Sequence, residues 1–113
     1  MARVDSIRAK IDKLAAKGKL ANLQKFAEDA DPEIREAVAV ALSKINTYES
    51  GMALIPLLRD SVPMVRAMAA TSAATIQAKH CEEYVKKLAF ADPDPNVRVT
   101  AKAAYDQLKT SVL

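Results

Sequence analysis

Apolar and small residues recur at intervals of three and four along three long segments of the chain, which is the period of one face of an α-helix. In the first segment these positions are Val38, Ala39, Ala41, Leu42 and Ile45. In the second they are Ala69, Ala70, Ser72, Ala73 and Ile76. The third has Ala101, Lys102, Ala104, Tyr105 and Leu108 in matching places. The pattern predicts three long helices that each bury one face.

Each of these segments begins with a proline, and an arginine follows three residues later. The three openings are Asp31-Pro32-Glu33-Ile34-Arg35, Val62-Pro63-Met64-Val65-Arg66 and Asp94-Pro95-Asn96-Val97-Arg98. The prolines are 31 and 32 residues apart, and so are the arginines. Asp31 and Asp94 are good N-cap residues, and proline is favoured at the first helical position because its missing N–H has no partner there. We therefore expect each long helix to begin at its proline.

A shorter helix is predicted before each long one. Its apolar positions are Leu20, Leu23 and Phe26 in the first copy, Leu54 and Leu57 in the second, and Val85 and Leu88 in the third. The chain has only two glycines and 4% aromatic residues, which leaves little material for β-hairpin turns and favours an all-α fold. Because one pair of helices cannot bury its apolar stripe alone, neighbouring pairs are expected to stack.

The three copies resemble HEAT repeats. An aspartate stands six residues before each arginine, at Asp29 and Arg35, Asp60 and Arg66, and Asp92 and Arg98. The ~31-residue period is similar to that of the short HEAT-like repeats of phycobilisome lyases and many bacterial proteins. The resemblance covers residues 19–109 and implies a right-handed α-solenoid in which these Asp and Arg side chains form a ladder between neighbouring units. It does not imply one function, because the family includes scaffolds, lyase subunits, hydroxylases and nucleic-acid enzymes.

The resemblance divides the chain as one domain, 1–113, of about three and a half repeats. Residues 1–17 form an N-terminal capping helix, and the repeats span 19–46, 49–78 and 81–109. Shifted by 31, Ile7, Ile11 and Leu14 fall on core positions of the first long helix. Arg8 and Lys10 replace its small positions, which would prevent a preceding repeat from packing there, and Lys102 marks the other outer face in the same way. Gly18 is expected to end the first helix in the left-handed conformation.

The residues needed for catalysis or metal binding are scarce. His80-Cys81-Glu82 is the one cluster that resembles a site, but a catalytic zinc needs three protein ligands and the chain has no second histidine. We predict no catalytic residue, no metal site and no cofactor. Cys81, the only cysteine, is interpreted as a small apolar core residue; the alternatives are a reactive thiol or a bilin acceptor. For Arg35, Arg66 and Arg98, an anion-binding role is the alternative to the structural ladder.

Charge is unevenly distributed along the chain. Residues 1–25 carry seven basic and two acidic residues, 7 − 2 = +5, so the remainder sums to 3 − 5 = −2. One function hypothesis is therefore nucleic-acid binding through the first helix, with anion contacts from Arg8, Lys10, Lys13 and Lys17. Aromatic residues for base stacking are few, which argues against it. A single cysteine and the lack of a long apolar run favour a cytoplasmic location without membrane contact.

The favoured hypothesis is a non-enzymatic module that binds a protein partner or a second copy of the chain. In HEAT-like proteins the second helix of each repeat lines the concave side, and here that side has few charges. The residues assigned to it are Val40, Lys44, Met68, Thr71, Thr75, Val99 and Ala103. Such a surface suits a partner helix or an extended peptide. The lyase resemblance leaves a third hypothesis open, an accessory subunit of a tetrapyrrole lyase.

Overall fold

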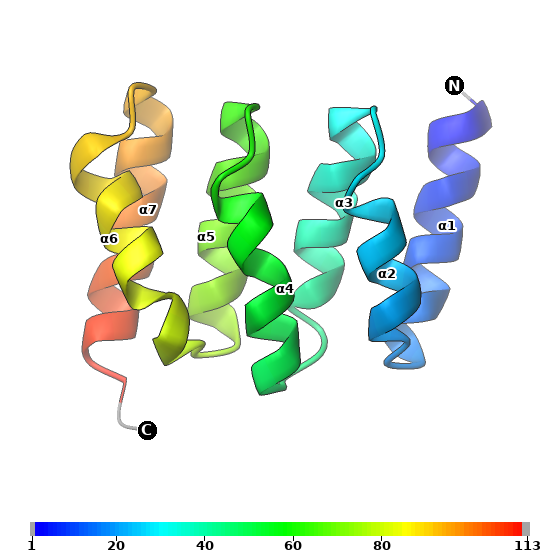
Figure 1. Cartoon of the computed structure of the whole chain (residues 1–113), viewed down its shortest axis with the longest axis horizontal. Coiled ribbons are helices and arrows are strands. Elements are labelled where there is room, and N and C mark those ends of the chain that lie inside the picture. The colour runs from blue at the N-terminus through cyan, green and yellow to red at the C-terminus, as the bar shows by residue number, and fades with distance from the viewer. Residues whose placement is uncertain (1, 112–113) are drawn as a thin grey trace.

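This computed structural model describes residues 2–111, in which helices joined by short turns are the only regular elements (Figure 1). This part of the chain contains no strand, so the all-α prediction is confirmed. The elements, in order, are α1 (Ala2–Ala16), α2 (Leu20–Phe26), α3 (Pro32–Leu42), α4 (Tyr48–Leu58), α5 (Pro63–Thr75), the short 3₁₀-helix η1 (Lys79–Cys81), α6 (Glu82–Ala91) and α7 (Pro95–Lys109).

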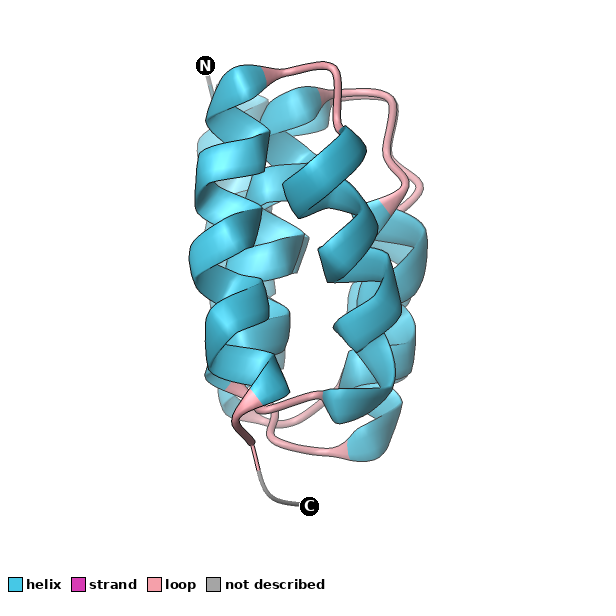
Figure 2. Ribbon diagram, turned by 90° about the vertical axis from the view of Figure 1, so that its left-hand side faces the viewer, coloured by secondary structure: helices cyan, strands magenta, loops and turns pink. Residues whose placement is uncertain are grey.

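The helices lie in two layers. Helices α1, α3, α5 and α7 pack side by side in that order and form one layer, which we call the odd-helix layer. Helices α2, α4 and α6 form the other, the even-helix layer, and each packs against the odd helix that follows it. Figure 2 shows the two layers side on, with the loops at either end. The turns that join α2 to α3, α4 to α5 and α6 to α7 lie at the same end of the molecule (Figure 1).

Local sequence signals account for the helix boundaries. The Asp31 carboxylate accepts a hydrogen bond from the Glu33 N–H, and the Asp94 carboxylate accepts from Asn96 and Val97, so both predicted N-caps are confirmed. Each of the helices α3, α5 and α7 begins at its proline. At the end of α1, Gly18 takes φ = 65°, as predicted, and the next N–H donates to the carbonyl of Leu14.

The core lies between the two layers. Ile34, Val65 and Val97 stand one residue before the three arginines and are each at most 1% exposed. The even-helix layer contributes side chains such as Leu23, Leu54 and Val85, which are fully buried. Residues at matching positions of the three helical pairs are therefore buried in the same way. Because the buried positions match, the exposed positions of the three pairs match as well.

The contact between α3 and α5 depends on small residues. Ala39 and Ala70 are fully buried, and the Ser72 hydroxyl donates to the Ala39 carbonyl oxygen at 2.6 Å. Larger side chains here would hold the two helices apart. Within residues 2–111, no helix combines the length and the apolar character that crossing a membrane requires.

Candidate functional site

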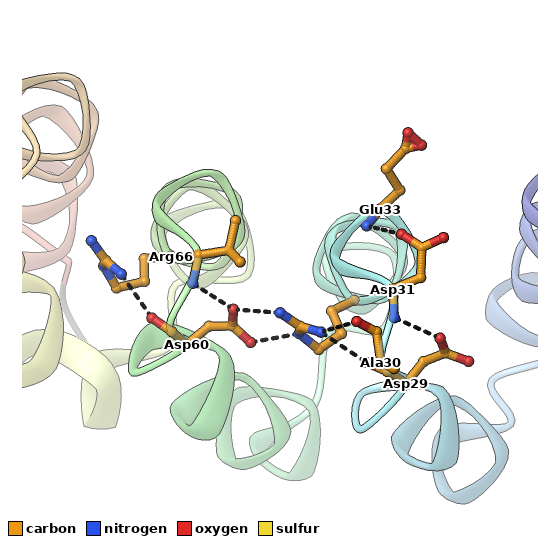
Figure 3. Close-up of polar contacts among 8 residues, drawn as sticks. Asp29, Ala30, Asp31, Glu33, Asp60 and Arg66 are labelled. Carbon is orange, nitrogen blue, oxygen red and sulfur yellow. Dashed lines mark hydrogen bonds and ion pairs between the residues drawn. The ribbon is translucent and has the colours of Figure 1, made fainter.

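Two buried ion pairs connect successive helical pairs at the end of the molecule where the intra-pair turns lie. Arg35 donates from Nε and Nη2 to the two carboxylate oxygens of Asp60 at 2.8 and 3.1 Å. Arg66 contacts Asp92 in the same way, at 2.7 and 2.9 Å. Figure 3 shows Asp60 and Arg66 in this row, with Asp29 at the turn of the preceding pair. Each ion pair joins the arginine of one helical pair to the aspartate of the next helical pair.

Each ladder arginine also contacts its own turn. Nη1 donates to the carbonyl oxygen six residues earlier, at 2.8 Å for Arg35, 2.8 Å for Arg66 and 2.6 Å for Arg98. The backbone carbonyl of each aspartate thus accepts from the arginine of its own helical pair. Its carboxylate accepts from the arginine of the preceding helical pair. Three in-phase copies of this contact hold the three guanidinium groups in the same orientation.

The ladder aspartates also fix the turns in which they lie. The carboxylates of Asp29, Asp60 and Asp92 each accept the backbone N–H two residues later, at 2.9 Å in all three turns. The segments that join the helices differ in length, 27–31, 59–62 and 92–94, but all three keep this hydrogen bond. The aspartates therefore act as turn residues and as ion-pair partners at once.

The pKa values of two of these aspartates are lowered. Burial opposes the ionisation of Asp92, but hydrogen bonds from Arg66 and from the Asp94 N–H, together with the charges of Arg66 and Arg98, outweigh it and lower its pKa. For Asp29 the Asp31 N–H is the largest cause, and Arg3 adds to the lowering against partial desolvation. Both carboxylates are therefore ionised at neutral pH, which suits the ladder.

Arg3 is a ladder residue that the sequence analysis missed. Its Nη2 donates to the Asp29 carboxylate at 2.8 Å, so α1 supplies the arginine for the first pair. The spacing was the available signal, because Arg3 precedes Asp29 by 26 residues, while Arg35 precedes Asp60 by 25 and Arg66 precedes Asp92 by 26. Aligning the first helix by its apolar residues instead placed Val4 at this position.

The residues assigned to the binding surface lie on α3, α5 and α7, in the odd-helix layer, except Lys44, which lies in the turn directly after α3. Val40, Thr71 and Ala103 each stand five residues after a ladder arginine, and all three are exposed. Lys44 and Thr75, nine residues after theirs, are exposed beside them. We call these five residues the odd-helix face.

Two further residues assigned to this surface lie differently. Met68 is half-buried and packs against the core. Val99 is 72% exposed, but it directly follows Arg98 and so lies towards the outer side of α7. Neither residue belongs to the centre of the odd-helix face.

The basic residues of α1 and of the turn after it, where Lys17 lies, do not gather on one face. Arg8, Lys10, Lys13 and Lys17 are all exposed. Spacings of three and four place Lys10, Lys13 and Lys17 together, whereas Arg8 falls on another side of the helix. The Arg3 guanidinium is already hydrogen-bonded to the Asp29 carboxylate. On this side of the molecule, the basic residues that an extended anion could contact together are therefore the three lysines.

The even-helix layer contains a groove that the sequence analysis did not anticipate. It has a volume of about 460 Å³ and lies between α4 and α6. Leu58, Tyr84 and Leu88 supply apolar walls, and the Arg66–Asp92 pair lies at its edge. Its residues come from two different helical pairs, so periodicity along the sequence gives no signal for it.

Comparison with protein-family models and with curated proteins found no match.

The His80-Cys81-Glu82 cluster has a packing role in the structure. Cys81 is completely buried, its thiol donates to the Gly51 carbonyl oxygen at 3.3 Å, and burial raises its pKa to about 11. The His80 ring stacks on Tyr48 with centroids 4.2 Å apart and lies directly against Gly51, where a Cβ would collide with it. Among the described residues, no group of three His, Cys, Asp or Glu side chains is arranged to hold a metal ion.

Proposed function

We propose that this chain is a non-enzymatic protein-binding module built as a HEAT-like α-solenoid, and that the odd-helix face contacts the partner. The observation that carries the proposal is the row of exposed, uncharged residues Val40, Thr71 and Ala103 on three neighbouring helices. In a chain in which 27% of the residues are charged, an exposed row without charge is unusual. Depletion of charge at the centre is the compositional mark of a protein interface.

The geometry of the layer supports a helical or extended partner. Helices α3, α5 and α7 lie side by side (Figure 1), and Val40, Thr71 and Ala103 stand at matching positions on them, five residues after Arg35, Arg66 and Arg98. Val40 is 42% exposed, and Lys44 provides a charged border. An apolar strip bordered by polar groups is what a partner helix uses when it docks on a helical surface.

The test compares two variants that change the net charge equally. The binding variant carries Val40→Glu and Ala103→Glu, and the control carries Met52→Glu and Tyr84→Glu on the even-helix layer. Each immobilised protein is incubated with a lysate of the source organism, and retained proteins are identified by mass spectrometry. Sedimentation of the pure protein at about 100 µM detects binding of a second copy.

We expect the control to retain at least one protein, or to form a dimer, as the unchanged chain does. In the binding variant the affinity for that protein, or for the second copy, should fall about tenfold, since a buried unpaired charge costs more than 1 kcal/mol. Thermal melts of both variants should agree with the unchanged protein to within a few degrees, because all four positions are exposed. Loss in the control variant alone would assign binding to the groove between α4 and α6 and would refute the proposal. Equal retention by all three proteins would refute it too.

Nucleic-acid binding through α1 is the competing function, and the same preparation tests it. Three aligned lysines give weak, salt-sensitive binding. We expect the protein to leave a heparin column well below about 0.3 M salt, where screening lengths are shorter than the ~8 Å of physiological salt. Retention beyond that concentration, abolished by Lys10→Gln with Lys13→Gln, would favour the nucleic-acid function instead.

A further inference from the structure

Arg98 repeats the backbone contact of the other ladder arginines, but no carboxylate among residues 2–111 forms an ion pair with it. Its Nη1 donates to the Asp92 carbonyl oxygen at 2.6 Å, the same contact that Arg35 and Arg66 make with the carbonyl oxygen six residues earlier. In those two residues the Nε and Nη2 edge holds the aspartate of the next pair. Among residues 2–111, no side chain reaches the corresponding edge of Arg98. A two-pronged carboxylate site is therefore already oriented on α7.

An aromatic pair, the exposed Phe90 and the half-buried Tyr105, lies on the same outer side of the third helical pair. Phe90 stands two residues before Asp92, as Leu58 stands two residues before Asp60. Leu58 is 2% exposed, whereas Phe90 is 62% exposed. The Phe90 and Tyr105 rings meet edge to face with centroids 6.0 Å apart, and Lys109 lies 5.4 Å from the centre of the Tyr105 ring. The position that is covered in the second pair is thus open and aromatic in the third.

We propose that the outer side of the third pair, formed by Phe90, Arg98, Tyr105 and Lys109, docks a partner protein through a helical hairpin whose turn carries an aspartate. The partner's carboxylate binds the Nε and Nη2 edge of Arg98, and its apolar residues cover Phe90 and Tyr105. Because the guanidinium is already held by its own turn, less side-chain entropy is lost on binding. This surface is separate from the odd-helix face.

Charge favours such a partner over a second copy of the chain. Arg98, Lys102 and Lys109 outweigh Asp106, so α7 has a net charge of 3 − 1 = +2. Two copies meeting through this surface would bring like charges together. Contact with residues 1–25 of another copy would meet a segment of net charge +5. A hairpin that offers an acidic turn complements the surface, and its charge also assists the encounter.

The experiment uses a tethered hairpin as the probe. A copy of residues 82–111 is joined after Leu113 of the full chain. The substitution Lys102→Ala is made in both the extended and the unextended chain, because the matching positions Ala39 and Ala70 are small and fully buried between neighbouring helices. When Arg98 is aligned with Arg66, residues 111–113 take the positions of residues 79–81. The copied aspartate then follows Arg98 by 26 residues, as Asp92 follows Arg66. The tether supplies a high effective concentration, so weak affinity does not hide the contact. A matched probe carries asparagine in place of the copied aspartate.

We expect the extended chain to unfold in one cooperative transition, with a melting temperature raised by about 5 °C or more. The asparagine probe, or Arg98→Gln in the extended chain, should remove most of this rise, while Arg98→Gln in the unextended chain should change its melting temperature by less than about 2 °C. A hairpin that unfolds separately, or an equal rise with the asparagine probe, would overturn the proposal. So would a dimer of the unextended chain that Arg98→Gln abolishes. Variants of Val40 and Ala103 leave this result unchanged, so the two binding surfaces are tested independently.

Discussion

The ladder contacts differ most in burial. Arg66 and Asp92 have side chains only 12% and 2% exposed, whereas Arg3 is 59% exposed in its contact with Asp29. Removing one partner of a buried pair leaves an uncompensated charge and costs about 3–5 kcal/mol. A surface pair contributes less than about 1 kcal/mol. The inner contacts therefore hold the helical pairs in register, and the contact at α1 contributes little.

The Cys81 thiol provides a prediction at this scale. Because burial raises its pKa to about 11, we expect alkylation by iodoacetamide at pH 8 to be at least a hundredfold slower than in the urea-unfolded protein. Mass spectrometry of timed samples measures both rates. Fast labelling of the folded protein would instead indicate an accessible, reactive thiol and would revive the hypothesis of a functional cysteine.

At the scale of the helix, two C-termini end with the same geometry but different residues. Gly18 after α1 has φ = 65° and Gln77 after α5 has φ = 53°. In both, the following N–H reaches back to a carbonyl near the helix end, Lys19 to Leu14 at 2.9 Å and Ala78 to Ala73 at 2.9 Å. This hydrogen-bond pattern requires the left-handed conformation, which costs a residue with a side chain about 1 kcal/mol.

Exchanging the residues at these two termini should have opposite effects. Gln77→Gly relieves the left-handed strain and should raise stability by about 1 kcal/mol, because Gln77 is exposed and loses no packing. Gly18→Ala should lower stability by a similar amount, although no atom lies within 4 Å of the added Cβ. Urea unfolding curves measure both. A Gln77→Gly variant less stable than the unchanged protein would contradict this account of the α5 terminus.

The sequence predicted the helices better than it predicted their contacts. Prolines, N-cap aspartates and Gly18 are local signals, and they placed the starts of α3, α5 and α7 and the end of α1 correctly. The left-handed Gln77 had no such signal, because glutamine is not typical of that conformation. The aspartate six residues before each arginine was visible in the sequence, but the side-chain partner lies 25 or 26 residues away and depends on how pairs pack. For the same reason Arg3 and the groove between α4 and α6 were missed.

For the whole molecule, register between the helical pairs determines which residues are exposed. The ladder aligns α3, α5 and α7 so that Val40, Thr71 and Ala103 form one row, and it leaves the carboxylate site of Arg98 open at the outer side. Both proposed surfaces therefore depend on the same contacts. A loss of register would move the row apart and would also change the direction of Arg98.

The coupling between Arg66 and Asp92 is the most direct test of this account. Urea unfolding of Arg66→Ala, Asp92→Ala and the double variant at pH 7 gives the interaction free energy, because contacts that each residue makes elsewhere cancel in the cycle. The exposed pair Lys102 and Asp106, 48% and 47% exposed, serves as the control and should couple by less than about 0.5 kcal/mol. We predict a coupling of about 2 kcal/mol or more for Arg66 and Asp92. Additive losses to within about 0.3 kcal/mol would show that this ion pair does not hold neighbouring helical pairs together.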